Sequence, residues 1–415
     1  MKVEKKKDMK RFILVFAGFL LLNTAKAQAP HLYEHTYPAV SEEHPQIRAL
    51  MDQVSVDSLT ATIDLLQSCF TRRWDSWMVY EVQDWLYNQY LDMGYDSVAL
   101  HDFPVTYHDS LFETSDNVIA VKKGLLYPDE YVVCGAHYDS YNLSDGHPDS
   151  LRAPGADDNA SGVSGVLEMA RILSSCTFER SVVFCNFAAE EIGLVGSAAY
   201  AKDCADQRMD IVGYFNLDMI GYLEEGSDIH VNLLYTGQDS LLAKYVFGFS
   251  RTYFPEMRIW QSWLSWGDSD YSSFNRNGYP AVHTFEDTHH SSPFIHTPDD
   301  ILGVSVNNMD QAKRFTELNL GLVATLAGLI SNEVADEPVP AVTVFPNPAD
   351  ESIRIKGLAV KQIHIYDVLG QQVISKLLSD EEEGEIQVGS LVPGIYMVRI
   401  IDSEGKSFIE RMIKN

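Results

Sequence analysis

The stretch YVVCGAHYDS at residues 131–140 places an apolar run directly before a histidine and an aspartate. Two later stretches repeat this arrangement: SVVFCNF at 181–187 precedes the Glu190–Glu191 pair, and VGYFNL at 212–217 precedes Asp218. Short runs rich in β-branched and aromatic residues are typical of buried strands in a parallel sheet. Ligands of open α/β sheets bind outside the carboxyl ends of the strands, so we expect these polar residues to converge at one edge.

Two further segments carry polar residues of the same kind. GADDNASG at 155–162 is a turn rich in Gly, Asp and Asn, and Asp158 lies within it. The apolar residues that follow repeat at the spacing of a helix: Val163, Val166, Leu167, Ala170 and Leu173. Asp158 therefore precedes a predicted helix, whose dipole favours a carboxylate at that end. The second segment, FIHTPDD at 294–300, supplies His296.

Five metal-capable side chains form a hard set of nitrogen and oxygen ligands, which suits zinc or a similar divalent ion. They are His137, Asp158, Glu191, Asp218 and His296. One catalytic zinc takes about three protein ligands, whereas this set suits two zinc ions with two private ligands each and one bridging carboxylate. Taken singly, a histidine after a strand is more often a polar surface residue, and adjacent glutamates more often a solvated loop pair. Their joint occurrence favours metal-assisted hydrolysis.

The motifs HxD, DDNASG, EE, LDM and HTPDD, in this order, resemble the zinc-dependent aminopeptidase family with co-catalytic metals, which also contains the glutaminyl cyclases. The similarity covers roughly residues 50–330. The resemblance implies an α/β fold with an open, mostly parallel mixed sheet and helices on both faces. It also implies that His137 and Asp218 hold one zinc ion, that Glu191 and His296 hold the other, and that Asp158 bridges them.

The resemblance also implies roles for two further carboxylates. Glu190 is expected to be the general base that takes a proton from the attacking water. Asp139 is expected to hydrogen-bond the His137 imidazole and fix its tautomer. The expected substrates are peptides with a free amino terminus, from which the enzyme hydrolyses N-terminal residues. A tyrosine that assists the oxyanion in some family members aligns near Trp266, so the identity of that helper stays open.

Several large side chains are candidates for lining a substrate pocket, although core packing is the default expectation for each. They are Met219, Trp260, Trp263 and Trp266. His283 lies in the apolar run PAVHTF and is expected to be a hydrogen-bonded core residue.

Two other functional classes stay open beside the aminopeptidase. A glutaminyl cyclase shares the fold and most ligands but commonly works with one zinc ion. The stretches AEEIGLVGSAAY at 189–200 and SDYSSFNRNGYPA at 269–281 resemble the peptidase branch instead. A non-catalytic surface protein with a degenerate site is the other alternative, and the complete ligand set together with Glu190 argues against it.

The composition indicates an exported protein that does not bind nucleic acid. The formal net charge is −28 at pH 7, which repels nucleic acid and favours solubility. Residues 1–27 combine a basic start, an apolar stretch from Phe12 to Leu22 and the triplet Ala25-Lys26-Ala27, the pattern of a secretory signal peptide. No other segment approaches about 18 uninterrupted apolar residues, so we expect no transmembrane segment after signal cleavage.

The composition changes after Ile330, where an acidic, proline-bearing stretch follows. Beyond it, short alternating runs separated by Gly, Asp and Ser predict a small β-sandwich. We therefore expect a catalytic domain at 28–331, a linker at 332–342 and a C-terminal β-sandwich at 343–415.

The C-terminal segment also resembles a known domain. FPNPA at 345–349, IYDVLGQQV at 365–373 and LVPGIYMVRI at 391–400 are similar to the C-terminal sorting domain read by the type IX secretion system of Gram-negative bacteria. The resemblance implies type IX secretion machinery as a partner, and export through the periplasm to the cell surface or the medium. Such domains are usually cleaved during export. The alternative is an accessory β-sandwich that binds substrate or carbohydrate.

Overall fold

The computed structural model describes most of the chain in two compact units, Met1–Ser331 and Asn332–Asn415. The described residues are 34–107, 110–112, 114–143, 151–265, 267–330, 343–356, 360–366, 372–377, 385–402 and 407–415. The predicted signal peptide at 1–27 and the predicted linker at 332–342 lie outside these ranges.

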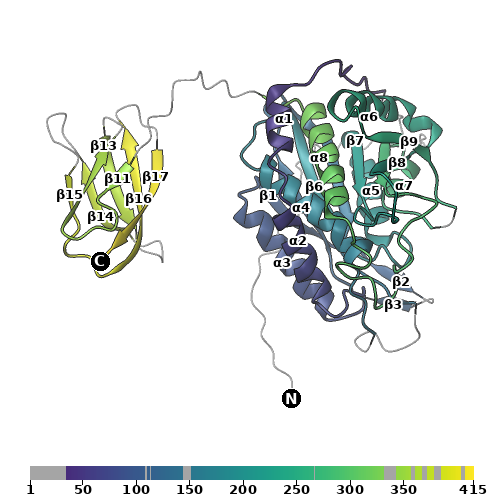
Figure 1. The fold of residues 1–415 in the computed structure, drawn as a ribbon, viewed down its shortest axis with the longest axis horizontal. Coiled ribbons are helices and arrows are strands. Elements are labelled where there is room, and N and C mark those ends of the chain that lie inside the picture. The colour runs from purple at the N-terminus through teal and green to yellow at the C-terminus, as the bar shows by residue number, and fades with distance from the viewer. Residues whose placement is uncertain are drawn as a thin grey trace, which may run out of the picture. The chain divides into compact units, whose positions relative to one another are not determined.

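An eight-stranded sheet runs through the first unit in the order β1-β4-β6-β5-β7-β10-β8-β9 (Figure 1). The strands of this sheet are β1 (Ser97–His101), β4 (Asn117–Lys122), β5 (Tyr127–His137), β6 (Arg180–Phe187), β7 (Asp210–Leu217), β8 (His230–Leu234), β9 (Arg258–Ser262) and β10 (Ala281–Phe285). The central strands β6, β5, β7 and β10 pair in parallel, as do β8 and β9, and the other pairs are antiparallel. The predicted mostly parallel mixed sheet is confirmed. A separate hairpin joins β2 (Val105–Tyr107) to β3 (Ser110–Phe112).

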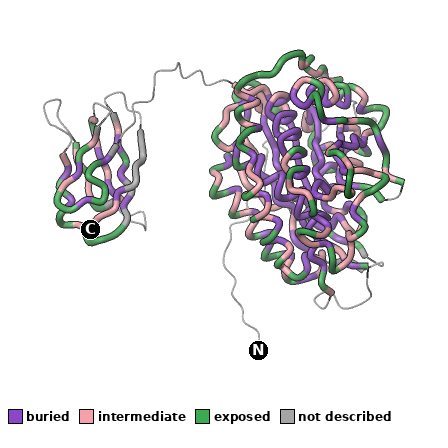
Figure 2. The backbone as a smooth tube through the Cα atoms, viewed as in Figure 1, coloured by how far each residue is buried: buried purple, intermediate pink, exposed green. Residues whose placement is uncertain are grey.

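Helices cover both faces of this sheet, as predicted. They are α1 (Pro45–Met51), α2 (Val56–Gln67), α3 (Met78–Asp92), α4 (Gly162–Leu173), α5 (Val195–Asp206), α6 (Ser240–Tyr253), α7 (Tyr271–Arg276) and α8 (Met309–Leu326). Successive side chains of a strand point to opposite faces, and β5 shows the result. Val132 packs in the larger core with residues of α4 and α8, whereas Val133 packs in the smaller core with Tyr200 of α5 and Phe274 of α7. Buried residues, drawn purple, run through the interior of the first unit (Figure 2).

The apolar runs of the sequence account for the central strands. The three quoted runs are the buried parts of β5, β6 and β7, which are covered by helices on both sides. The predicted helix after the GADDNASG turn is α4, whose apolar residues are buried. No helix among the described residues is long and apolar enough to cross a membrane.

The second unit consists of two antiparallel sheets that share one core. One sheet has the order β11-β12-β15, and the other has the order β14-β13-β16-β17. Their strands are β11 (Thr343–Phe345), β12 (Ser352–Lys356), β13 (Val360–Tyr366), β14 (Gln372–Leu377), β15 (Glu385–Gln387), β16 (Gly394–Asp402) and β17 (Ser407–Lys414). Ile353 and Ile386 of the first sheet pack with Ile363, Val398 and Met412 of the second. This arrangement agrees with the expected small β-sandwich.

Candidate metal centre

The structure brings the five metal-capable residues together at the carboxyl ends of the central strands. His137 is the last residue of β5, and Asp218 directly follows β7. Glu191 lies in the turn after β6, and His296 lies in the loop between β10 and α8. Asp158 belongs to the turn Ala156–Ser161, directly before α4, and has non-helical backbone angles there. The edge predicted from the sequence is therefore the edge at which these side chains meet.

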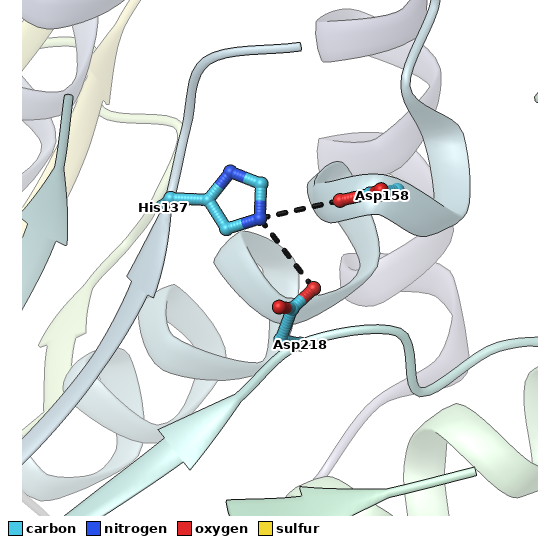
Figure 3. A group of neighbouring side chains, drawn as sticks. All are labelled: His137, Asp158 and Asp218. Carbon is cyan, nitrogen blue, oxygen red and sulfur yellow. Dashed lines mark ion pairs between the residues drawn. The ribbon is translucent and has the colours of Figure 1, made fainter. Parts of the chain in front are cut away.

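The five side chains form two groups that share Asp158. In the first, His137 Nε2 lies 3.2 Å from Asp158 Oδ1 and 3.5 Å from Asp218 Oδ1 (Figure 3). In the second, His296 Nε2 lies 3.1 Å from Asp158 Oδ2 and 2.8 Å from Glu191 Oε2. Each carboxylate oxygen of Asp158 thus faces a different histidine.

The donor atoms of this cluster fit divalent cations. Both ring nitrogens of His137, Asp218 Oδ1 and Glu191 Oε1 are buried and make no hydrogen bond among the described residues. Buried polar atoms without partners are unfavourable unless a further group, such as a metal ion, satisfies them. Zinc bonds of about 2.0–2.2 Å in tetrahedral geometry place neighbouring ligand atoms roughly 3.3 Å apart, close to the separations seen here.

The cluster contains more carboxylates than imidazoles, and this excess of negative charge favours a bound cation. Burial opposes a charged His137, but the Glu190 and Asp218 carboxylates raise its pKa well above the usual range. Burial also opposes a charged His296, but Asp158 and Glu191 raise its pKa to about 11. Burial, followed by the Asp158 charge, raises the pKa of Glu191 to about 8. Without a metal ion the cluster therefore retains protons, which a divalent cation would replace.

Glu190 and Asp139 lie beside the cluster. Glu190 is buried, and its Oε2 lies 4.0 Å from His137 Nε2. Asp139 Oδ1 lies 3.5 Å from His137 Nδ1, longer than a normal hydrogen bond. Asp139 also accepts the backbone N–H groups of Glu190 at 3.1 Å and of Glu191 at 3.2 Å. This second contact was not expected from the sequence, and it orients the whole Glu190–Glu191 turn.

Two more residues support the cluster and were missed by the sequence interpretation. Asp300, the last residue of the HTPDD motif, accepts the backbone N–H groups of Asp157 and Asp158 through its two oxygens. Ser269 Oγ donates to Asp218 Oδ2 at 2.7 Å and fixes that carboxylate. Asp300 and Ser269 both lie inside sequence motifs quoted above. Their place in those motifs was the only feature of the sequence that could have identified them. His283 is buried with Nε2 3.1 Å from the Asp218 carbonyl oxygen, so the predicted hydrogen-bonded core histidine is confirmed.

Of the four large side chains considered for a substrate pocket or for the core, the three described ones differ in burial. Met219 is buried in a small apolar cluster with Leu234 and Phe285, next in sequence to Asp218. Trp260 is 41% exposed and Trp263 is 72% exposed, so the default of core packing is wrong for both. Trp260 lies in edge strand β9, where its ring stacks on His230 of β8, and Trp263 follows the end of that strand at Ser262. Trp266 lies outside the described residues.

Two family models match this chain. Residues 117–322 match peptidase family M28, and residues 343–415 match the secretion system C-terminal sorting domain. The chain is 35% identical over 213 residues to aminopeptidase YwaD of Bacillus subtilis, covering 48% of this chain and 43% of that protein. The chain therefore spans less than half the length of YwaD. It is 26% identical over 310 residues to leucine aminopeptidase 1 of Leptosphaeria maculans, covering 70% of this chain and 76% of the relative.

Solved structures share the fold of the first unit. The LapA aminopeptidase of Legionella pneumophila aligns with a TM-score of 0.60 and 24% identity over 71% of this chain and 78% of LapA. A glutaminyl cyclase of Porphyromonas gingivalis aligns with a TM-score of 0.55 and 18% identity over 66% of this chain and 98% of the cyclase. The fold alone therefore does not separate a peptidase from a cyclase.

The family matches indicate what the two units of this protein are similar to. Residues 117–322 are similar to peptidase family M28, and the two sequence relatives aligned above are aminopeptidases. The chain also carries a C-terminal sorting domain of a secretion system, which marks it for export.

Proposed function

We propose that this protein is a two-zinc aminopeptidase. The observation that carries the proposal is the position of Asp158, whose two oxygens lie 3.2 Å from His137 Nε2 and 3.1 Å from His296 Nε2. A carboxylate in this position is suited to bridging two ions. His137 and Asp218 would hold one zinc ion, and Glu191 and His296 would hold the other. Two imidazoles and three carboxylates are ligands that zinc accepts.

Glu190 is the proposed general base. Two zinc ions held by this cluster would supply Lewis-acid activation of a water molecule and of the scissile carbonyl group. Without metal ions, burial raises the pKa of Glu190 well above its usual range. Two bound divalent cations nearby would favour its carboxylate form, which is the form that accepts a proton. Glu190 accepts a proton from the attacking water and later donates it to the leaving amine. Asp139 holds the backbone of Glu190 while this transfer takes place.

The proposed substrates are peptides with a free amino terminus. An unblocked amino group in its neutral form offers a nitrogen ligand of the kind that zinc accepts, which would favour peptides with a free amino terminus. The apolar cluster of Met219, Leu234 and Phe285, with Ile295 packed against it, is continuous in sequence with Asp218 and His296. This cluster suits an apolar first side chain.

Export is the second part of the proposal. The sorting-domain match at 343–415 and the signal-peptide pattern at 1–27 support passage through the periplasm to the cell surface or the medium. We propose that the type IX secretion machinery binds the second unit and that this unit is cleaved during export. The working enzyme would then consist of the catalytic domain at 28–331, released near the linker at 332–342.

A glutaminyl cyclase is the alternative function, because the Porphyromonas enzyme has the same fold. Product analysis distinguishes the two. Purified protein loaded with zinc is incubated with a leucine-initiated peptide, its N-acetylated form, and a glutamine-initiated peptide. We expect free leucine and free glutamine from the unblocked peptides and no product from the acetylated one. Release of ammonia from the glutamine peptide, without free amino acids from any peptide, would establish the cyclase instead.

A further inference from the structure

Arg72 is a fully buried guanidinium beside the metal centre. It is 0% exposed, and no carboxylate among the described residues forms an ion pair with it. The hydrogen bonds of its side chain all go to backbone carbonyl oxygens. Nε donates to Tyr138 O at 2.8 Å and Nη2 donates to Gly155 O at 2.8 Å, while Nη1 donates to Leu66 O and Pro154 O.

The bonded carbonyls belong to the segments that carry two of the candidate ligands. Tyr138 lies between His137 and Asp139, and Gly155 opens the turn that contains Asp158. The backbone N–H of Arg72 donates to Ser140 Oγ at 3.0 Å, and that hydroxyl in turn donates to Ala153 O at 2.7 Å. Arg72 therefore ties the end of β5 to the turn before α4, both by its guanidinium and by its main chain.

Gly155 shows how closely these segments approach one another. It has a φ of +54°, and a Cβ at this position would lie 2.8 Å from Arg72 Nη2 and 2.5 Å from Asp158 O. A side chain at this position would displace either the guanidinium or the Asp158 backbone. Position 155 therefore requires glycine for two reasons: the neighbouring atoms leave no room for a Cβ, and the backbone has a positive φ.

The charge of Arg72 also acts on the metal centre. Burial lowers the pKa of Arg72, because the guanidinium loses its hydration, while Asp300, Asp139 and Asp158 attract its charge. A buried cation without a paired carboxylate is unfavourable unless nearby dipoles and charges compensate. Here the compensation comes from four carbonyl groups and from carboxylates that hold or support the metal ligands.

We propose that Arg72 is a positioning residue of the metal centre, which sets the separation of His137 and Asp158 through the main chain that carries them. Its side-chain hydrogen bonds all go to backbone carbonyl groups, so it acts on the centre through the main chain. Because Asp158 is shared by both halves of the centre, Arg72 affects the binding of both ions. This inference rests on the two-zinc function proposed above and deepens it by naming what holds the two half-sites in register.

Arg72→Lys tests the proposal. Lysine keeps the charge but carries its donors on one nitrogen, which cannot reach carbonyl groups in three segments at once. Metal-free wild type and variant are titrated with zinc against a competing chelator, at a temperature where both are folded. We expect the affinity for both ions to fall about 10- to 100-fold, the usual effect of losing a support behind a metal ligand.

Arg180→Lys is the matched control. Arg180 also donates to a backbone carbonyl, Leu326 O at 3.0 Å, and to Glu130 at 2.6 Å, but it lies at the amino end of β6. We expect this variant to lower the melting temperature without changing zinc affinity. Arg72→Met removes every side-chain donor, so it is also expected to bind zinc more weakly than wild type. The lysine variant decides the question if the methionine variant does not fold.

The outcomes separate the role of Arg72 from the proposed function. Zinc affinities within about twofold of wild type in folded Arg72→Lys would overturn the proposal, whatever the melting temperature, because a purely structural arginine changes stability alone. Binding of fewer than two ions by the wild type would contradict the two-zinc function instead. The ratio of variant to wild-type affinity, taken for each ion that binds, still measures the effect of Arg72 in that case.

Discussion

The carboxylate of Asp300 accepts the backbone N–H of Asp158 at 3.2 Å, across 142 positions of the chain. Its other oxygen accepts the N–H of Asp157 at 2.8 Å. Asp300 lies in the same loop as His296, so this loop presents one candidate ligand and also fixes the main chain of another. Two segments distant in sequence are held in register by one buried side chain.

Asp300→Asn is expected to weaken zinc binding. Asparagine keeps one acceptor oxygen, so one of the two N–H groups loses its partner and the Asp158 turn loosens. We expect zinc affinity to fall about 10- to 100-fold, measured by chelator competition on the purified protein. Asp299→Asn changes the exposed neighbour in the same loop and is the matched control. Equal affinities in the two variants would show that Asp300 does not support the centre.

Glu190→Gln and Glu191→Gln are expected to differ in what they lose. Glutamine at 190 keeps shape and hydrogen bonding but removes the base, so kcat should fall about 10²- to 10⁴-fold while zinc content stays near that of wild type. Glutamine at 191 replaces a proposed ligand, so zinc content should fall together with kcat. Steady-state kinetics and metal analysis of both proteins check this. Zinc lost at 190 and retained at 191 would mean that the two roles are exchanged.

The metal-free protein is expected to lose stability as pH rises. The carboxylates around His296 raise its pKa to about 11 despite burial, so its contribution is complete below its unfolded pKa of about 6.5 and disappears towards pH 11. Burial raises the pKa of Glu191 to about 8, so the folded state retains a proton that the unfolded chain releases from about pH 4.3 upward. Both raised pKa values therefore make the free energy of unfolding decrease as pH rises between these limits.

The melting temperature of the metal-free protein should therefore decrease from about pH 5 to about pH 9. Zinc replaces these protons, so the zinc-loaded protein should show a smaller decrease over the same range. Calorimetry of both forms in matched buffers provides the measurement. A metal-free melting temperature that rises steadily across this range is the contrary result.

Removal of residues 343–415 is expected to leave catalytic activity unchanged and to abolish export from the periplasm. The two compact units have separate cores, so the first should keep its melting temperature and its peptidase activity. The truncated protein should accumulate in the periplasm of a host with type IX secretion, as judged by cell fractionation. A large drop in the melting temperature of the catalytic domain would show that the second unit has a structural role.

The central sheet and the five clustered residues were predictable from the sequence for a physical reason. Strands β5, β6 and β7 are buried on both faces, so each is a continuous apolar run that ends at a polar residue. The carboxyl ends of parallel strands meet at one edge, which brings His137 and Asp218 together.

The supports of the cluster were not predictable in the same way. Arg72 and Asp300 act through backbone groups of segments distant in sequence, and no local pattern records such contacts. Trp260 was misjudged because a tryptophan in a strand usually packs in a core, whereas β9 is an edge strand whose side chains are largely exposed. The predicted signal peptide and linker remain predictions, since both lie outside the described residues.

Anomalous diffraction at the zinc edge, from crystals of the zinc-loaded catalytic unit, tests the central claim most directly. The account predicts two strong peaks, one between His137 and Asp218 and the other between Glu191 and His296, with Asp158 contacting both. A single peak would contradict the two-metal centre and favour the cyclase alternative. No peak within reach of Asp158 would remove the proposed mechanism.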